Sequence, residues 1–131
     1  MTGLRLYKKE RLCSKIAIDA LFLPGAKDKH TVLAYPWRAV WRVNDRRAVS
    51  CAQFLISVPK KRLRHAVDRV VMRRRCREAY RLNRSLLGES PRVDISFIYV
   101  GNGLADYSST SRAVCRILSR IGDAVKNTDR Q

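Results

Sequence analysis

Apolar and polar positions along the chain follow two periods, one typical of helices and one typical of strands. Apolar residues spaced by three and four predict a short helix over about 14–22, which Pro24-Gly25 ends. The same spacing in about 109–126 predicts a long C-terminal helix with one apolar stripe, whose simplest role is core packing. The stripe consists of Val114, Ile117, Leu118, Ile121 and Val125.

Alternation of apolar and polar residues predicts three strands. We expect the first over about 31–43, where Pro36 indicates an edge position or a bulge near its start. The polar run 44–47 is expected to form a turn to an antiparallel second strand over about 48–58. A third strand is expected over about 93–100.

A basic helix is expected between the second and third strands, from about Arg64 to Arg84. The order helix, two antiparallel strands, helix, strand, helix predicts one α+β sandwich domain over residues 1–131, because a helix between two strands of one sheet makes a crossover. The chain is long enough to bury a core without disulfides. Its charged end, about 127–131, is expected to fray.

The chain has a large excess of basic over acidic residues, which bears on its function. The 131 residues include 28 Lys+Arg against 11 Asp+Glu, a formal net charge of +17. Self-repulsion at this charge opposes compaction, and a polyanionic partner would offset it. Nucleic acid and an anionic membrane surface are both candidates, and a merely soluble basic protein is the plainer alternative.

The sequence argues against a membrane-inserted or secreted protein. No apolar run approaches the roughly 20 residues of a spanning helix. The first segment, Met1–Leu12, is too polar for a secretion signal. We therefore expect a cytoplasmic protein whose four cysteines are reduced thiols, since none of them forms a CxxC pair.

Positive charge is concentrated in residues 60–84, where only Asp68 and Glu78 oppose it. Arginines four residues apart form a ridge along the predicted helix, and like charges at this spacing repel by a few tenths of a kcal/mol. Phosphates would neutralise such a ridge, and the planar guanidinium can bind phosphate with two hydrogen bonds. A solvated charged face is the alternative, although it would normally mix signs. The candidate RNA-binding residues are Lys60, Lys61, Arg62, Arg64, His65, Arg69, Arg73, Arg74, Arg77 and Arg81.

The apolar residues of the same helix form two groups. We expect the first group to dock the helix on the sheet, and it consists of Ala66, Val67, Val70 and Val71. The second group either buries another flank of the helix or is partly exposed, and it consists of Met72, Cys76, Ala79 and Tyr80.

Catalytic signatures are missing from the sequence. It contains no P-loop and no GxSxG motif. Neither His30 nor His65 lies at metal-ligand spacing from a cysteine, so no zinc site is expected. No catalytic residue is therefore assigned to this chain.

The segment 60–81 resembles the motif of the bacterial ribonuclease P protein component, roughly KK…A-x-x-RNR-I-K-R-x-x-RE-x-aromatic-R. The matching residues are Lys60-Lys61, Ala66-Val67-Asp68-Arg69, Met72-Arg73-Arg74 and Arg77-Glu78-Ala79-Tyr80-Arg81, together with Leu21-Phe22, Gly25 and Tyr35-Pro36 in the N-terminal half. The element order matches over nearly the whole chain. Val70 and Val71 stand where the family has Asn and Arg. RNA contacts at these two positions would be lost or taken over by neighbours.

The resemblance implies a specific function. The protein would bind a large catalytic RNA, and the assembled ribonucleoprotein would remove the 5′ leader of precursor tRNA by hydrolysis. Magnesium ions (Mg2+), bound mainly by the RNA, would activate the water. The expected partners are the catalytic RNA and precursor tRNA, with no membrane and no obligate protein partner. The family fold is an α/β sandwich with a left-handed crossover, against the right-handed norm.

The resemblance further implies a cleft between the first helix and the sheet that holds the single-stranded leader. Phe22 and Trp41 match aromatic positions of this cleft, and Ile18 stands where an aromatic often occurs. Unpaired bases can stack on aromatic rings without sequence preference. Core packing is an equal alternative for Phe22 and the simpler one for Trp41.

The amino-acid composition is also compatible with other functions. A structural RNA-binding protein, such as a ribosomal protein, fits the composition equally well, but the ordered motif disfavours it. A DNA-binding protein fits less well because no helix-turn-helix pair is evident. A membrane-surface helix also fits less well, because the basic helix has no broad apolar face.

Overall fold

The computed structural model describes residues 10–12, 15–22, 29–44, 52–87 and 92–129, and the structural statements below concern these residues. The α+β class is confirmed, and helices occur in the three predicted regions. In chain order, the elements are α1 (Lys15–Phe22), β1 (His30–Ala34), β2 (Trp37–Val43), β3 (Gln53–Ser57), α2 (Ala66–Asn83), the 3₁₀ turn η2 (Arg84–Leu87), β4 (Val93–Tyr99) and α3 (Tyr107–Asp129).

The predicted single strand over 31–43 is two strands. The chain reverses at Tyr35-Pro36, so that β1 and β2 pair antiparallel with Ala34 opposite Trp37. Proline lacks the N–H that a continuing ladder would need, and the strand therefore ends there. The resulting hairpin places the Tyr35-Pro36 turn at one end of the sheet.

The predicted antiparallel pairing of the second strand is also wrong. The strands of the described residues lie in the order β1-β2-β4-β3, and β3 runs parallel to β4 with Phe54 opposite Ile95. β4 is buried on both faces over most of its length, which suits the middle of a sheet between two neighbours. The crossover between the parallel strands is α2. Residues 45–47 of the predicted turn lie outside the described residues.

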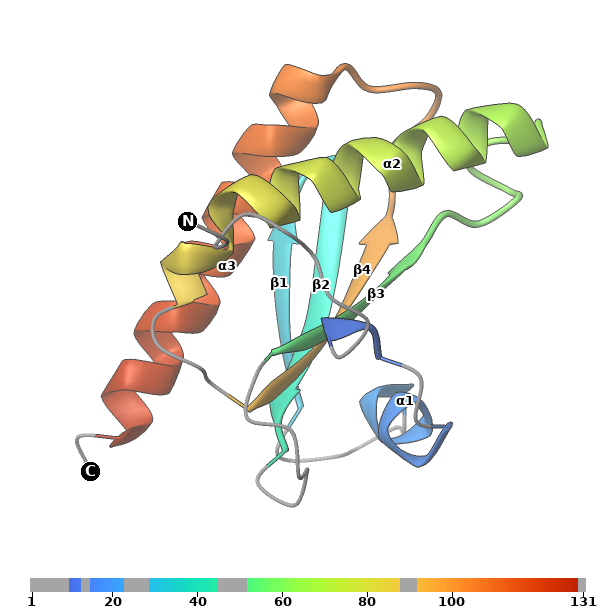
Figure 1. Cartoon of the computed structure of the whole chain (residues 1–131). Coiled ribbons are helices and arrows are strands. Elements are labelled where there is room, and N and C mark those ends of the chain that lie inside the picture. The colour runs from blue at the N-terminus through green and yellow to red at the C-terminus, as the bar shows by residue number, and fades with distance from the viewer. Residues whose placement is uncertain (1–9, 13–14, 23–28, 45–51, 88–91, 130–131) are drawn as a thin grey trace.

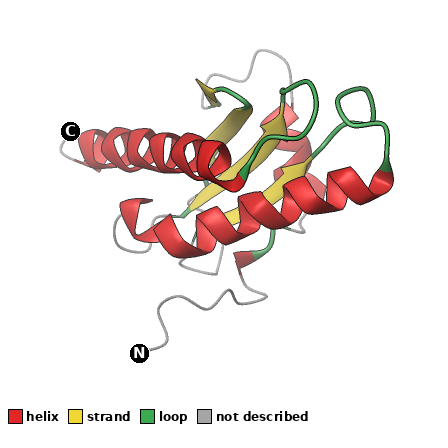
Figure 2. Cartoon of the chain, turned by 90° about the horizontal axis from the view of Figure 1, so that it is seen from above, coloured by secondary structure: helices red, strands yellow, loops and turns green. Residues whose placement is uncertain are grey.

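Helices cover both faces of this sheet. α2 and α3 lie on one face and α1 lies on the other, as two views at right angles show (Figure 1, Figure 2). The larger core lies beneath α2 and α3 and includes Trp37, Phe97 and Ile117. A smaller cluster beneath α1 joins Leu21 to Val40 of β2. The alternation predicted for β2 is thereby confirmed, because its two faces belong to different cores.

The prediction for the docking face of α2 is wrong. The helix packs on the core through the group predicted to be secondary, Met72, Cys76, Ala79 and Tyr80, all of which are buried. By contrast, Val67 is 73% exposed and Val70 is 44% exposed. The first turns of α2 extend past the edge of the sheet (Figure 1), so valines there have no apolar surface to cover. The larger Met and Tyr side chains dock where the helix crosses the strands.

α3 is longer than its predicted extent and begins with a side-chain cap. Asp106 Oδ1 accepts a hydrogen bond from Ser109 N at 2.8 Å, the interaction typical of a helix N-cap. The helix continues to Asp129, so residues 127–129 of the predicted frayed end are helical. Gly122 allows close packing against η2, because a Cβ there would lie 2.4 Å from Leu86 O.

Candidate nucleic-acid interface

The outward face of α2 carries basic side chains that make no ion pair within the described part of the chain. Burial of Met72, Cys76, Ala79 and Tyr80 fixes the rotation of the helix and turns Arg74 and Arg77 toward solvent. Arg73 is partly exposed on the flank between them and the buried stripe. These guanidinium groups lie on a helix anchored by its opposite side, so they form a positive surface on a backbone that is held against the core.

Other arginines among the candidate RNA-binding residues form hydrogen bonds within the protein. Arg69 donates from Nη1 to Leu63 O and Arg64 O, each at 2.9 Å, and so holds the turn before α2 against the helix. Arg62 Nη1 donates to Asn102 Oδ1 at 3.1 Å. Arg75, outside the predicted set, donates to Ala105 O. These bonds give the three residues a structural role whether or not RNA is bound.

Arg81 forms an ion pair with Glu78 one turn earlier on α2. The hydrogen bond from Arg81 lowers the pKa of Glu78, and the same bond raises the pKa of Arg81. The sequence prediction that Arg69, Arg73, Arg77 and Arg81 form one uniform ridge therefore needs refinement. Arg73 and Arg77, in the middle of the ridge, have no ion pair with a described residue, whereas Arg69 and Arg81 at its ends have intramolecular partners.

The segment before α2 adds further exposed basic groups. Lys60, Lys61 and Arg64 are exposed, and His65 is the N-cap residue of α2 without a side-chain capping bond. Leu63 is buried at 4% exposure and anchors this turn to the core. Positive side chains and the positive end of the helix dipole thus meet at the start of α2, where anionic groups are favoured.

The three predicted cleft residues do not share one surface. Phe22 is 46% exposed at the end of α1, and Ile18 packs partly against the small cluster beneath that helix. Trp41 is 4% exposed and belongs to the large core on the opposite face of the sheet, where it stacks on His30 with a centroid separation of 4.5 Å. Alternation along β2 places Trp41 with Trp37 and Ala39, away from α1. Trp41 therefore lies on the opposite face of the sheet from α1 and its Phe22.

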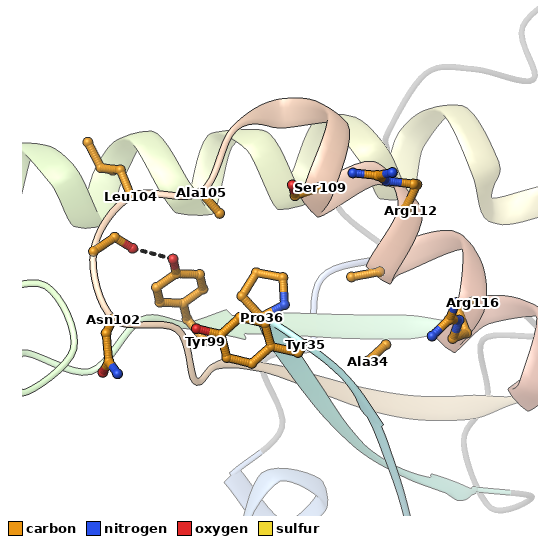
Figure 3. A pocket seen from close by; sticks show the side chains of 12 residues that line it. Ala34, Tyr35, Pro36, Tyr99, Asn102, Leu104, Ala105, Ser109, Arg112 and Arg116 are labelled. Carbon is orange, nitrogen blue, oxygen red and sulfur yellow. Dashed lines mark hydrogen bonds between the residues drawn. The ribbon is translucent and has the colours of Figure 1, made fainter.

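Two features of the structure have no signal in the sequence, a partly buried ion pair and a pocket. Arg84 Nη1 lies 2.6 Å from both carboxylate oxygens of Glu10, which ties the N-terminal segment to the end of α2. The pocket, of about 400 Å³, lies between the hairpin turn, the loop 101–105 and the start of α3 (Figure 3). Neither could be predicted, because the contributing residues are far apart in sequence and carry no motif.

The described residues include no group of three His, Cys, Asp or Glu side chains that could bind a metal ion together. Burial raises the pKa of the Cys76 thiol far above its ordinary value, which keeps it protonated. None of the described helices is both long and apolar enough to cross a bilayer.

Residues 6–122 match the protein-family model described as Ribonuclease P. The chain belongs to the ribonuclease P protein family. Ribonuclease P protein components from two strains of Porphyromonas gingivalis are 35% and 34% identical to it over 128 residues, which cover 94% of this chain and 90% of each relative. The family resemblance seen in the motif 60–81 is thereby confirmed.

Solved structures of ribonuclease P proteins share the fold. The Staphylococcus aureus RNase P protein has a TM-score of 0.58 at 18% identity and covers 89% of this chain and 95% of its own. A mutant of that protein, described as defective in mRNA degradation, has a TM-score of 0.56 over 93% of this chain and 90% of its own. As a ribonuclease P protein component, the chain is a subunit of a tRNA-processing ribonucleoprotein, and an RNA subunit is its partner.

Proposed function

We propose that the outward face of α2 binds the RNA subunit of ribonuclease P, and that the chain supports removal of the 5′ leader from precursor tRNA. The observation that carries this proposal is a set of basic side chains on and just before α2 that form no ion pair with any described residue. They are Arg73, Arg74 and Arg77 together with Lys60, Lys61 and Arg64. Phosphates of a folded RNA would neutralise this surface and release counterions. Val70 and Val71 contribute no charge, so their neighbours Arg73 and Arg74 provide the contacts in that region.

The face of the sheet beneath α1 is the proposed site for the leader. Phe22 offers an exposed ring at the end of α1, and Leu55 and Ile98 are partly buried against the cluster that α1 forms with Val40. Arg38 is exposed on the same face of β2 and can interact with a phosphate. Unpaired leader nucleotides would stack on Phe22 with little sequence preference. Ile18 borders this surface, and Trp41 has no part in it.

The chemistry is assigned to the RNA. In this proposal, the RNA subunit binds the magnesium ions needed for hydrolysis, and this chain positions the two RNAs. Its contribution is therefore affinity and orientation rather than proton transfer. Positioning alone can lower a barrier substantially, because it removes the entropy cost of bringing the reactants together.

A leader-length series tests the proposal. A bacterial ribonuclease P RNA is assembled with this chain and given precursor tRNAs whose leaders are one or about ten nucleotides long. We expect the chain to lower KM more for the long leader, and Phe22→Ala to reduce that difference by roughly 5-fold or more, the effect of one lost base stack. Leu86→Ala is the matched control, because Leu86 is similarly exposed, at 42%, on η2. An equal effect of the chain on both substrates would contradict the leader site.

A further inference from the structure

The pocket at the Tyr35-Pro36 end of the sheet lies apart from both surfaces described above. Figure 3 shows Tyr35, Pro36 and Tyr99 on one side of it, and Arg112 and Arg116 projecting from successive turns of α3 on the other. Tyr35 is 69% exposed, so its ring is available to a ligand. Arg112 and Arg116 are exposed and have no ion pair within the described part of the chain.

The walls of the pocket are held in place. Tyr99 is buried, and its hydroxyl donates to Gly103 O across the loop. Gly103 has φ +98, a conformation that favours glycine, and a Cβ at Gly101 would lie 2.9 Å from Pro36 Cβ. The loop therefore follows the hairpin turn closely, and the backbone on this side of the pocket is held in place.

The pocket is connected to the basic segment before α2. Asn102 lines the pocket and accepts the hydrogen bond from Arg62 Nη1. Ala105, also in the lining, accepts one from Arg75 of α2. Through these two bonds, the basic segment before α2 and α2 itself lie beside the loop that forms one wall of the pocket.

We infer that this pocket binds an unpaired RNA nucleotide, with the base stacked on Tyr35 and the adjoining phosphates held by Arg112 and Arg116. A volume of about 400 Å³ accommodates one nucleotide. Exposed tyrosine and arginine are the residue types that bind unpaired bases and their phosphates. The inference rests on the proposed RNA-binding function and extends it to a third surface. The nucleotide belongs either to the RNA subunit or to precursor tRNA.

The first test measures binding of the full chain to a fluorescent unpaired oligouridine by anisotropy over a range of salt. Tyr35→Ala is expected to weaken binding roughly 5- to 100-fold, the range for one lost base stack. Arg112→Gln/Arg116→Gln is expected to reduce the dependence of log K on log salt by about 1.4, because two single-strand phosphate contacts are lost. Arg120→Gln is the matched control, since Arg120 is exposed one turn further along α3 and does not line the pocket.

The second test identifies the source of the nucleotide. If it belongs to the RNA subunit, the pocket variants weaken binding of that RNA in the absence of substrate. If it belongs to precursor tRNA, they raise KM in the assembled enzyme and leave binding of the RNA subunit unchanged. Pocket variants that match Arg120→Gln in every assay overturn the inference, and the proposed function stands if the unaltered chain still stimulates leader removal. Loss of oligouridine binding in the pocket variants supports the inference even if the unaltered chain does not stimulate cleavage.

Discussion

Removing two arginines from the outward face of α2 should weaken RNA binding without weakening the fold. Arg73 and Arg77 lie one turn apart and make no ion pair within the described part of the chain, so Arg73→Gln/Arg77→Gln breaks no internal contact of that kind. Surface changes of this type alter the free energy of unfolding by less than about 0.5 kcal/mol. Any effect on RNA binding would therefore reflect the interface itself.

The size of the effect follows from counterion release. Each phosphate contact contributes about 0.9 to the slope of log K against log salt, so loss of two contacts lowers the slope by about 1.8. Between about 50 and about 200 mM salt, the unaltered chain should then lose roughly 12-fold more affinity than the variant. Filter binding of the ribonuclease P RNA at several salt concentrations measures this difference, and thermal unfolding checks the fold.

A control with the same net charge separates a local contact from a general electrostatic effect. Arg120→Gln/Lys126→Gln removes two exposed charges from α3 and leaves α2 intact. We expect a nearly unchanged slope of log K against log salt for this control. If both double variants lower the slope equally, only the net charge of the chain matters, and the assignment of the α2 face to RNA is refuted.

Three further predictions concern other parts of the molecule. Val70→Asn/Val71→Arg adds one positive charge beside Arg73 and Arg74. RNA titrations should then show a slope of log K against log salt that is larger by about 0.9. An unchanged slope would mean that RNA does not approach the first turns of α2. Asp106→Ala removes the cap of α3 and should lower the unfolding midpoint by a few degrees, whereas Asp106→Asn keeps a capping oxygen and should lower it less. The hydrogen bonds from Ser109 lower the pKa of Asp106, so the part of its contribution that depends on the carboxylate charge is present above the unfolded pKa of about 3.9 and disappears as pH falls through the lower folded pKa. Equal midpoints for the Ala variant and the unaltered chain at pH 7 would exclude this role. Gly122→Ala forces a Cβ toward Leu86 O and should lower the free energy of unfolding, measured with urea, by about 1–3 kcal/mol. An unchanged free energy of unfolding would mean that η2 can move away from α3.

Periodicity predicted the regions of the three helices, and it was most informative for α3, which has a long apolar stripe on one side. The stripe of α3 places Val114, Ile117 and Leu118 in the core as expected. Strand pairing was not predictable in the same way. The alternation in 48–58 shows which residues face a core, but it does not show that β4, much later in the chain, is the partner of β3. The hairpin at Tyr35-Pro36 was misread as one strand because both of its halves alternate.

The basic site was predicted in outline from local sequence, since the density of arginine over 60–84 identifies the helix directly. The role of each arginine depends on tertiary contacts. Arg69 donates to two carbonyls of the preceding turn, and Arg75 donates to Ala105, which is 30 residues away in sequence. The apolar groups of α2 were assigned in the wrong order because sequence alone does not show which turns lie over the sheet. Trp41 matches a cleft position of the family, but core packing is the simpler prediction, and the pleat of β2 directs Trp41 into the larger core.

The most direct test of the account is leader removal from precursor tRNA by a bacterial ribonuclease P RNA at low magnesium, with and without this chain. The account predicts that the chain stimulates cleavage and that Arg73→Gln/Arg77→Gln loses most of this stimulation while the fold is retained. Failure of the unaltered, folded chain both to stimulate cleavage and to bind that RNA would contradict the central claim that its basic surface serves the RNA subunit.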